Sequence, residues 1–285
     1  MNLIHFQGLN CYHDCVISVA NHFGVDYSLA FTTLWSETDF SYDSYHKVYL
    51  TKRLLTNLEE LGVKIEELDC LSQKDTDRII PQFYEGEFMI IGMDAFYIPW
   101  DPFYQKFHGP HYFIAQNVKL GMLLCFDPTY DKKNEQLPRR EIIEHAYAIC
   151  RINRVEKKAL RIEAIHEARE IVNTHPDTQS VLLSHIYGCI GGERENTVLL
   201  AKYIDAMINN RFLYRFFLES QQLPDNENHL FLNSDFFLEW KAVKNGLYKA
   251  SISRSHESII NNVCDHFIHL MDQEIDVAEK IICNN

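Results

Sequence analysis

Three residues in the first half of the chain have the types and the order of a cysteine nucleophile and its base. Cys11 precedes a helical pattern, His111 begins one apolar run, and Asp127 ends the next. A thiolate attacks carbonyl carbon, an imidazole moves protons, and a carboxylate holds the imidazole in one tautomer. We therefore predict acyl chemistry at Cys11, with His111 as the base and Asp127 as the residue that orients it.

The local pattern places Cys11 at the start of a helix that covers about residues 12–23. Apolar side chains recur there with the i, i+3, i+4, i+7 spacing of a helix, at Val16, Val19, Ala20 and Phe23. The free N–H groups at a helix start favour a thiolate by only about 0.3–1 kcal/mol, so a histidine must contribute as well. Neighbouring strands lie about 4.8 Å apart, so Asp127 can orient His111 only if the strand register aligns them.

The remaining patterns predict an α+β domain at 1–150 and an all-helical domain at 151–285. In the first domain we expect helices at 47–60 and 72–84, strands at 88–92, 112–118 and 122–126, and a tight turn at 119–121. In the second we expect about five helices, among them 156–173, 195–221, 235–249 and 256–282, with a loop at 223–228.

Composition excludes several classes of protein. The chain is 46% hydrophobic and 24% charged, which is ordinary for a globular protein, and its net charge of −13 argues against nucleic acid as a partner. No apolar run reaches the roughly 20 residues that span a bilayer, and the first residues do not resemble a signal peptide. We expect a cytoplasmic protein with no membrane partner, whose eight scattered cysteines are reduced.

Other polar residues near the nucleophile are interpreted as structural. Cys15 follows Cys11 by one helical turn and is expected in the core, while His13 and Asp14 suit the first turn of a helix. His108 and His111 lack the ligand spacing of a zinc site, so we predict no metal.

Two sets of motifs carry a family resemblance. The Asn-Cys11 pair, the His-Phe-Gly24 sequence and a His111 followed by an Asp-Pro pair at 127 resemble papain-like cysteine peptidases, particularly those that process bacteriocins. The sequence GMDAFYIPW at 92–100, followed by GPHYF at 109–113, resembles the butirosin biosynthesis protein H family. The motifs cover residues 3–130, and over 156–285 the resemblance consists of helical content alone.

The resemblance implies a papain-like N-terminal domain followed by a helical domain. It further implies an acyltransferase of antibiotic biosynthesis, of the aminoglycoside side-chain type. The acyl group would come from the phosphopantetheine thioester of an acyl carrier protein and go to a small-molecule amine, with no cofactor in the chain itself. Two alternatives remain: a peptidase or amidase that uses the same three residues with water, and a binding protein without activity. The oligomeric state is left open.

The oxyanion and substrate residues are less sharply defined. Papain-like enzymes place a glutamine about six residues before the cysteine, whereas Gln7 lies four before Cys11, so Asn10 and the Cys11 N–H are alternative donors. Asp94, Tyr97 and Trp100 precede His111 in an aromatic segment. This segment either lines the substrate or packs as a compact loop.

A basic stretch at 139–161 stands out in an acidic chain. It is either a solvated face or a docking surface for an acidic carrier protein. For docking we single out Arg151, Arg154, Lys157 and Lys158.

Overall fold

A computed structural model describes residues 1–43, 48–68, 73–82, 84, 86–117, 121–158, 164–190, 192–221, 229–253 and 256–284. The chain divides into two compact units, each made of two stretches of sequence. The first unit comprises Met1–Tyr27 and Leu55–Leu160, and the second comprises Ser28–Leu54 and Arg161–Asn285. The mixture of a sheet in the N-terminal part and helices in the C-terminal part agrees with the predicted α+β class.

The first unit is built on a six-stranded antiparallel sheet. Its strand order is β3-β8-β4-β5-β6-β7. The strands are β3 (Val63–Leu68), β4 (Phe88–Asp94), β5 (Pro110–Asn117), β6 (Met122–Asp127), β7 (Lys132–Pro138) and β8 (Ala146–Arg154). The helices are α1 (Cys11–His22), α3 (Gln73–Ile79), α4 (Arg139–His145) and the short 3₁₀ segments η2 (Ile80–Gln82) and η3 (Ala95–Tyr97). Helix α2 (Arg53–Glu60) spans the division between the units.

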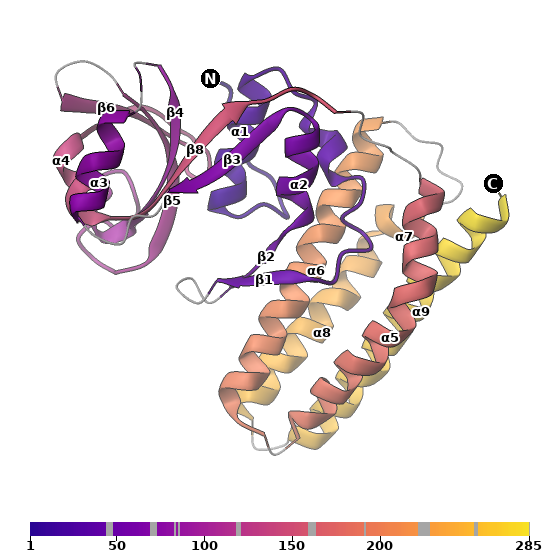
Figure 1. Cartoon of the computed structure of the whole chain (residues 1–285). Coiled ribbons are helices and arrows are strands. Elements are labelled where there is room, and N and C mark those ends of the chain that lie inside the picture. The colour runs from indigo at the N-terminus through magenta and orange to yellow at the C-terminus, as the bar shows by residue number, and fades with distance from the viewer. Residues whose placement is uncertain are drawn as a thin grey trace. The chain divides into compact units, whose positions relative to one another are not determined.

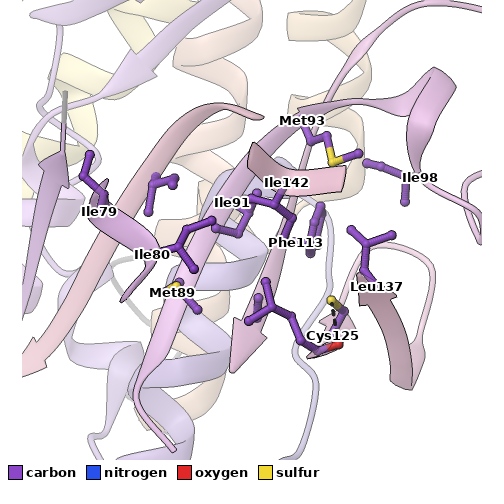
Figure 2. Packing of buried hydrophobic residues seen from close by; sticks show 13 residues of the cluster. Ile79, Ile80, Met89, Ile91, Met93, Ile98, Phe113, Cys125, Leu137 and Ile142 are labelled. Carbon is purple, nitrogen blue, oxygen red and sulfur yellow. Dashed lines mark hydrogen bonds between the residues drawn. The ribbon is translucent and has the colours of Figure 1, made fainter. Parts of the chain in front are cut away.

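The sheet is covered on both faces, which explains why β4 is an uninterrupted apolar run. Alternate β4 residues, beginning with Met89, join the hydrophobic core together with side chains of α3, η2 and α4 (Figure 2). The other set faces α1, where Phe88 contacts the rings of His22 and Phe23. Figure 1 shows α3 and α4 on one side of the curved sheet and α1 on the other. A short continuous apolar run predicted this strand, and burial on both sides explains why its residues are apolar throughout.

Gly92 is the one β4 residue whose small size the packing requires. A Cβ atom there would lie 2.7 Å from the ring of Tyr112 and 2.6 Å from that of Tyr147. These two rings meet edge to face across the glycine, with centroids 5.8 Å apart. The pair packs beside His111, which directly precedes Tyr112 in the chain.

The second unit is helical. Its elements are η1 (Tyr27–Phe31, which begins at the division), β1 (Phe40–Asp43), β2 (Val48–Thr51), α5 (Ala164–Gly188), α6 (Arg194–Gln221), α7 (His229–Leu232), α8 (Ser234–Ile252) and α9 (His256–Asn284). Helix α5 packs along α9, α9 along α8, and α8 along α6, as the long ribbons of Figure 1 show. Within the described residues, no helix is both long and apolar enough to cross a membrane.

Buried carboxylates fasten the Ser28–Leu54 stretch to the long helices. Glu37 accepts hydrogen bonds from the Asn210 side chain of α6 (2.8 Å) and from the backbone N–H of Arg53 (2.9 Å). Trp35 donates from its indole nitrogen to Glu274 of α9 (3.2 Å). Each such bond gives a partner to a buried polar group. Without a partner, the group would lower the stability of the fold by about 1–3 kcal/mol.

The division into units differs from the predicted boundary at residue 150. The Ser28–Leu54 stretch belongs to the helical unit, and β8 continues to Arg154 because it is an inner strand paired with both β3 and β4. The predicted helix at 47–60 begins only at Arg53, and β2 occupies the residues before it. The predicted turn at 119–121, the start of the helix at 72 and the loop at 223–228 fall wholly or largely outside the described residues.

Glu167 of α5 supplies a test of this fastening. It accepts a hydrogen bond from the backbone N–H of Ser36 (2.7 Å), and burial raises its pKa to about 7 although Ser36 and Arg53 act to lower it. The folded protein therefore holds this proton to higher pH than the unfolded chain. The resulting stabilisation is complete below about pH 4.5 and is lost as the pH rises through 7.

We expect Glu167→Gln, which stays neutral, to flatten this part of the stability profile. Relative to wild type, the variant should gain roughly 1–3 kcal/mol in free energy of unfolding between pH 5 and pH 8. Urea unfolding at the two pH values measures the change. Glu219→Gln, at a half-exposed position, serves as the control. Parallel profiles for wild type and Glu167→Gln would contradict the assignment.

Candidate active site

Cys11 is the first residue of α1, as predicted, and Asn10 caps the helix. The Asn10 side-chain oxygen accepts a hydrogen bond from the backbone N–H of His13 (2.9 Å), and its carbonyl accepts the first helical bond, from Asp14 (2.8 Å). The Cys11 side chain is partly accessible. The sulfur therefore lies at the positive end of the helix dipole, where reagents can reach it.

Strand pairing brings His111 and Asp127 together. Phe126 of β6 lies opposite Ile114 of β5, so Asp127 extends the ladder on the same face as Phe113 and His111. The Nε2 atom of His111 lies 2.7 Å from Oδ2 of Asp127, and both side chains are buried. The register that the sequence left open thus aligns the two residues.

The strands on either side of the pair depart from regular pairing close to it. The β4–β8 register shifts between Gly92 and Met93, and Met93 is the β4 partner of His111. The β6–β7 register shifts between Cys125 and Phe126, immediately before Asp127. Bulges of this kind turn side chains out of the regular alternation and are frequent beside functional residues.

Cys11 is the second partner of His111. The start of α1 lies beside the beginning of β5, where the rings of Tyr12 and Tyr112 meet with centroids 5.1 Å apart. The Cys11 side chain interacts with His111 and acts to raise the pKa of the imidazole. Because Nε2 already bonds Asp127, we assign this contact to Nδ1. Burial acts to lower the pKa of His111, but its bonds to Asp127 and Cys11 and their negative charges raise that pKa to about 10. The imidazole beside Cys11 is therefore positively charged near pH 7.

Two aromatic residues complete the surroundings of the pair. The indole N–H of Trp100 donates to Oδ2 of Asp127 (2.9 Å), and the backbone N–H of Tyr130 donates to Oδ1 (3.3 Å). The Tyr130 ring stacks on the His111 imidazole with centroids 5.0 Å apart. We predicted Trp100 as a substrate residue, but here it supports Asp127. Tyr130 was missed, and the only signal was its place just after the Asp-Pro pair.

The other predicted substrate residues hold the loop between β4 and β5. Asp94 accepts hydrogen bonds from the backbone N–H groups of Phe96 (3.1 Å) and Gly109 (3.0 Å), and it pairs with the His108 ring (2.7 Å). Tyr97 stacks on His145 of α4, with ring centroids 3.6 Å apart. The described contacts of these two residues therefore favour the packed-loop alternative over direct lining of the substrate.

Gln7 and Asn10, the two side chains predicted as oxyanion-hole donors, differ in exposure and in distance along the chain from Cys11. Gln7 is exposed, in a turn before α1. Asn10 is partly buried and adjacent to Cys11, and its capping bond engages only the side-chain oxygen. Among the described residues, no hydrogen bond uses the Asn10 amide nitrogen, so Asn10 fits the oxyanion role better than Gln7 does.

The neighbours of Cys11 on α1 are buried. Cys15 is fully buried, as predicted, and burial raises the pKa of its thiol well above the ordinary value. Burial also lowers the pKa of His13 to about 4, so this imidazole is neutral near pH 7. Asp14 is fully buried as well, which an acid that merely suits a helix dipole does not require.

The four basic residues singled out for docking are not on one surface. Arg151 and Arg154 lie on opposite faces of β8, because their separation along the strand is odd. Arg154 is exposed and lies over the Phe23 ring, 5.3 Å from its centroid. Lys157 and Lys158 follow the strand and are exposed, so three of the four residues remain candidates for one surface.

Two further features lie away from Cys11 in the described part of the chain. Glu141, Glu144 and His145 of α4 place potential metal-ligand atoms within 4.8 Å of one another. A cavity of about 530 Å³ opens between α5 and α6 of the second unit. Neither feature includes a predicted site residue.

Comparison with protein families gives one match. The model of the DUF1839 N-terminal domain matches residues 4–119, a span that contains Cys11 and His111 but ends before Asp127. No curated protein matches the chain.

The contacts of Cys11 predict an order of thiol reactivity that differs from the order of exposure. Cys283 is the exposed thiol among the described cysteines, and Cys11 is only partly accessible. We nevertheless expect iodoacetamide at pH 7 to label Cys11 roughly tenfold faster than Cys283, because an ordinary thiol is only a few per cent thiolate there. Peptide mapping of a time course measures both rates.

His111→Ala should remove this preference, and labelling in urea should equalise the two rates. Faster labelling of Cys283 in the folded protein would contradict the predicted pairing of Cys11 with His111.

Proposed function

We propose that this protein is a cysteine-dependent acyltransferase. In this proposal Cys11 accepts an acyl group from the phosphopantetheine thioester of an acyl carrier protein and passes it to a small-molecule amine. The observation that carries the proposal is the buried His111–Asp127 hydrogen bond of 2.7 Å, with Cys11 as the second partner of the same imidazole.

The proposed reaction has two steps that use the same residues. The Cys11 thiolate attacks the thioester carbonyl, a new carbon–sulfur bond forms, and the carrier thiolate leaves with the proton that His111 donates. The amine then attacks the acyl-enzyme, His111 takes one proton from its nitrogen, and Cys11 leaves. Exchange of one thioester for another is nearly neutral in energy, which suits a cysteine to this donor. Asp127 keeps the imidazole oriented in both steps.

The arrangement of the first unit supports a papain-like fold in this proposal. A helix that begins with the nucleophile packs against an antiparallel sheet, and neighbouring strands of that sheet carry the histidine and the carboxylate. The resemblance of the motifs at 92–100 and 109–113 to the butirosin biosynthesis protein H family points to carrier-bound acyl donors, an amine acceptor and antibiotic biosynthesis.

Hydrolysis of a peptide or amide bond by the same residues is the second candidate. The partial exposure of Cys11 favours it, because water can reach an acyl-enzyme at an accessible sulfur. The two candidates share the first step and differ in the acceptor. An experiment that supplies an amine therefore separates them.

The proposal predicts a covalent intermediate. Incubation with a small acetyl thioester should add one acetyl group to the protein, observed by intact mass spectrometry and mapped to Cys11. Cys11→Ser should give no thioester-linked adduct, whereas Cys283→Ser should react like wild type because it changes only an exposed thiol. A primary amine should discharge the adduct faster than buffer alone. Discharge at one rate with and without amine would favour the hydrolase, and the absence of any adduct would overturn the proposal.

A carrier-protein donor predicts dependence on the exposed basic residues that end and follow β8. We expect charge reversal of Arg154, Lys157 and Lys158 to slow acylation from an acetyl-loaded carrier protein by roughly tenfold or more at low salt. Acylation from the small thioester should be unchanged. Reversal of Lys132 and Lys133, which are exposed on β7, is the matched control. Equal losses with both donors would contradict docking at this surface.

A further inference from the structure

The segment that precedes α1 has no helix or strand to fix its position. Residues 1–10 form a loop with one turn, in which the backbone N–H of Leu9 donates to the carbonyl of Phe6 (3.2 Å), and Gly8 has a φ of +104°. This loop ends in Asn10, beside Cys11. Its placement therefore determines where the side-chain donors near the sulfur lie.

One buried oxygen atom joins this loop to the rest of the site. Oδ2 of Asp14 accepts a hydrogen bond from Nδ1 of His5 in the loop (2.8 Å) and another from the hydroxyl of Thr129 (2.7 Å). Asp14 is itself three residues after Cys11 on α1, and Thr129 is two residues after Asp127. The three segments that meet at Asp14 thus carry Asn10, Cys11 and Asp127.

The burial of Asp14 has an energetic cost that a simple helix-end acid would avoid. Asp14 has no exposed surface, whereas the His5 side chain is half exposed. Burial raises the pKa of the Asp14 carboxyl, and the bonds to Thr129 and His5 act to lower it. Its Oδ1 atom has no hydrogen-bond partner among the described residues. An exposed carboxylate would stabilise the helix start without this penalty.

We infer that Asp14 is a positioning residue that holds the loop with Asn10 in fixed relation to Cys11, with Thr129 as the second anchor of its carboxyl. The inference rests on the proposed acyl chemistry at Cys11. Through its bond to His5, Asp14 fixes the position of the loop whose Asn10 amide would donate to the acyl oxygen. The Thr129 hydroxyl donates to the same oxygen atom and thereby keeps the Asp14 carboxyl in place.

Two reactions of Cys11 separate this role from a general effect on the thiol. Acylation by p-nitrophenyl acetate passes through a tetrahedral oxyanion: sulfur bonds to the carbonyl carbon, and p-nitrophenolate leaves. In alkylation by iodoacetamide, sulfur bonds to the CH2 carbon and iodide leaves. No tetrahedral oxyanion forms in this reaction. Misplaced oxyanion donors therefore slow only the first reaction, whereas a weaker thiolate or a damaged fold slows both.

The experiment compares the two rates in the full chain. We expect Asp14→Asn, Thr129→Val and His5→Leu to lower the acylation rate roughly 10- to 100-fold while the alkylation rate stays within about threefold. His5→Asn, which keeps a donor at the place of Nδ1, should restore much of the loss. Asp131→Asn makes the same chemical change at an exposed position shortly after Thr129 and should behave like wild type. Thermal melting confirms that each variant is folded.

The outcomes are distinct. Acylation of Asp14→Asn and Thr129→Val at the wild-type rate would overturn the positioning role and leave the proposed function intact. Parallel losses in acylation and alkylation in folded variants would also overturn it, because Asp14 would then act on the thiol itself. A wild-type Cys11 that is alkylated but never acylated would overturn the proposed function, and the inference with it.

Discussion

Burying a carboxylate costs several kcal/mol unless donors surround it, and Asp127 is buried completely at the end of β6. Its donors come from three places: the His111 ring on the neighbouring strand, the Trp100 indole in the loop after β4, and the backbone of Tyr130 in the next turn. None of these elements can shift without leaving a charge unpaired. The need to satisfy one carboxylate therefore sets the register of two strands and the conformation of two loops.

The same charge explains the electrostatics of the neighbouring groups. Asp127 helps to hold the proton on His111, and the resulting positive charge acts on Cys11. Cys15 lies one turn deeper on the same helix, where burial and the nearby negative charges raise the pKa of its thiol. Two cysteines only four residues apart thus have different environments, because one interacts with the imidazole and the other is fully buried.

Much of the fold could be predicted from local patterns, but the edge strands β3 and β7 and the inner strand β8 were not. Helices α1, α6, α8 and α9 and strands β4 to β6 carry helical patterns or continuous apolar runs, and all were expected within a few residues. The edge strands β3 and β7 were missed because exposed edges select charged side chains, as in the sequences VKIEEL and KKNEQLP. The place of the Ser28–Leu54 stretch depends on partners such as Glu274, which lies 239 residues from Trp35. No local pattern contains that information.

The candidate site, too, could be predicted only in part from the sequence. Residue types, order and the helix-start position were sufficient to single out Cys11, His111 and Asp127. The support of Asp127 by Trp100 and the stacking of Tyr130 depend on loop packing and strand register, which a single sequence does not define. The separation of Arg151 from Arg154 has a similar cause, because both lie on β8, where an odd spacing puts side chains on opposite faces.

The interleaved connectivity of the two units has a consequence for synthesis on the ribosome. The Ser28–Leu54 stretch emerges early, but its buried partners Asn210 and Glu274 lie near the other end of the chain. At about 5–20 residues per second, the stretch waits on the order of tens of seconds before Glu274 is made. During that time Trp35 and Glu37 lack the groups that bury them. The nascent chain is therefore exposed to chaperones and proteases for longer than a protein whose domains follow one another in sequence.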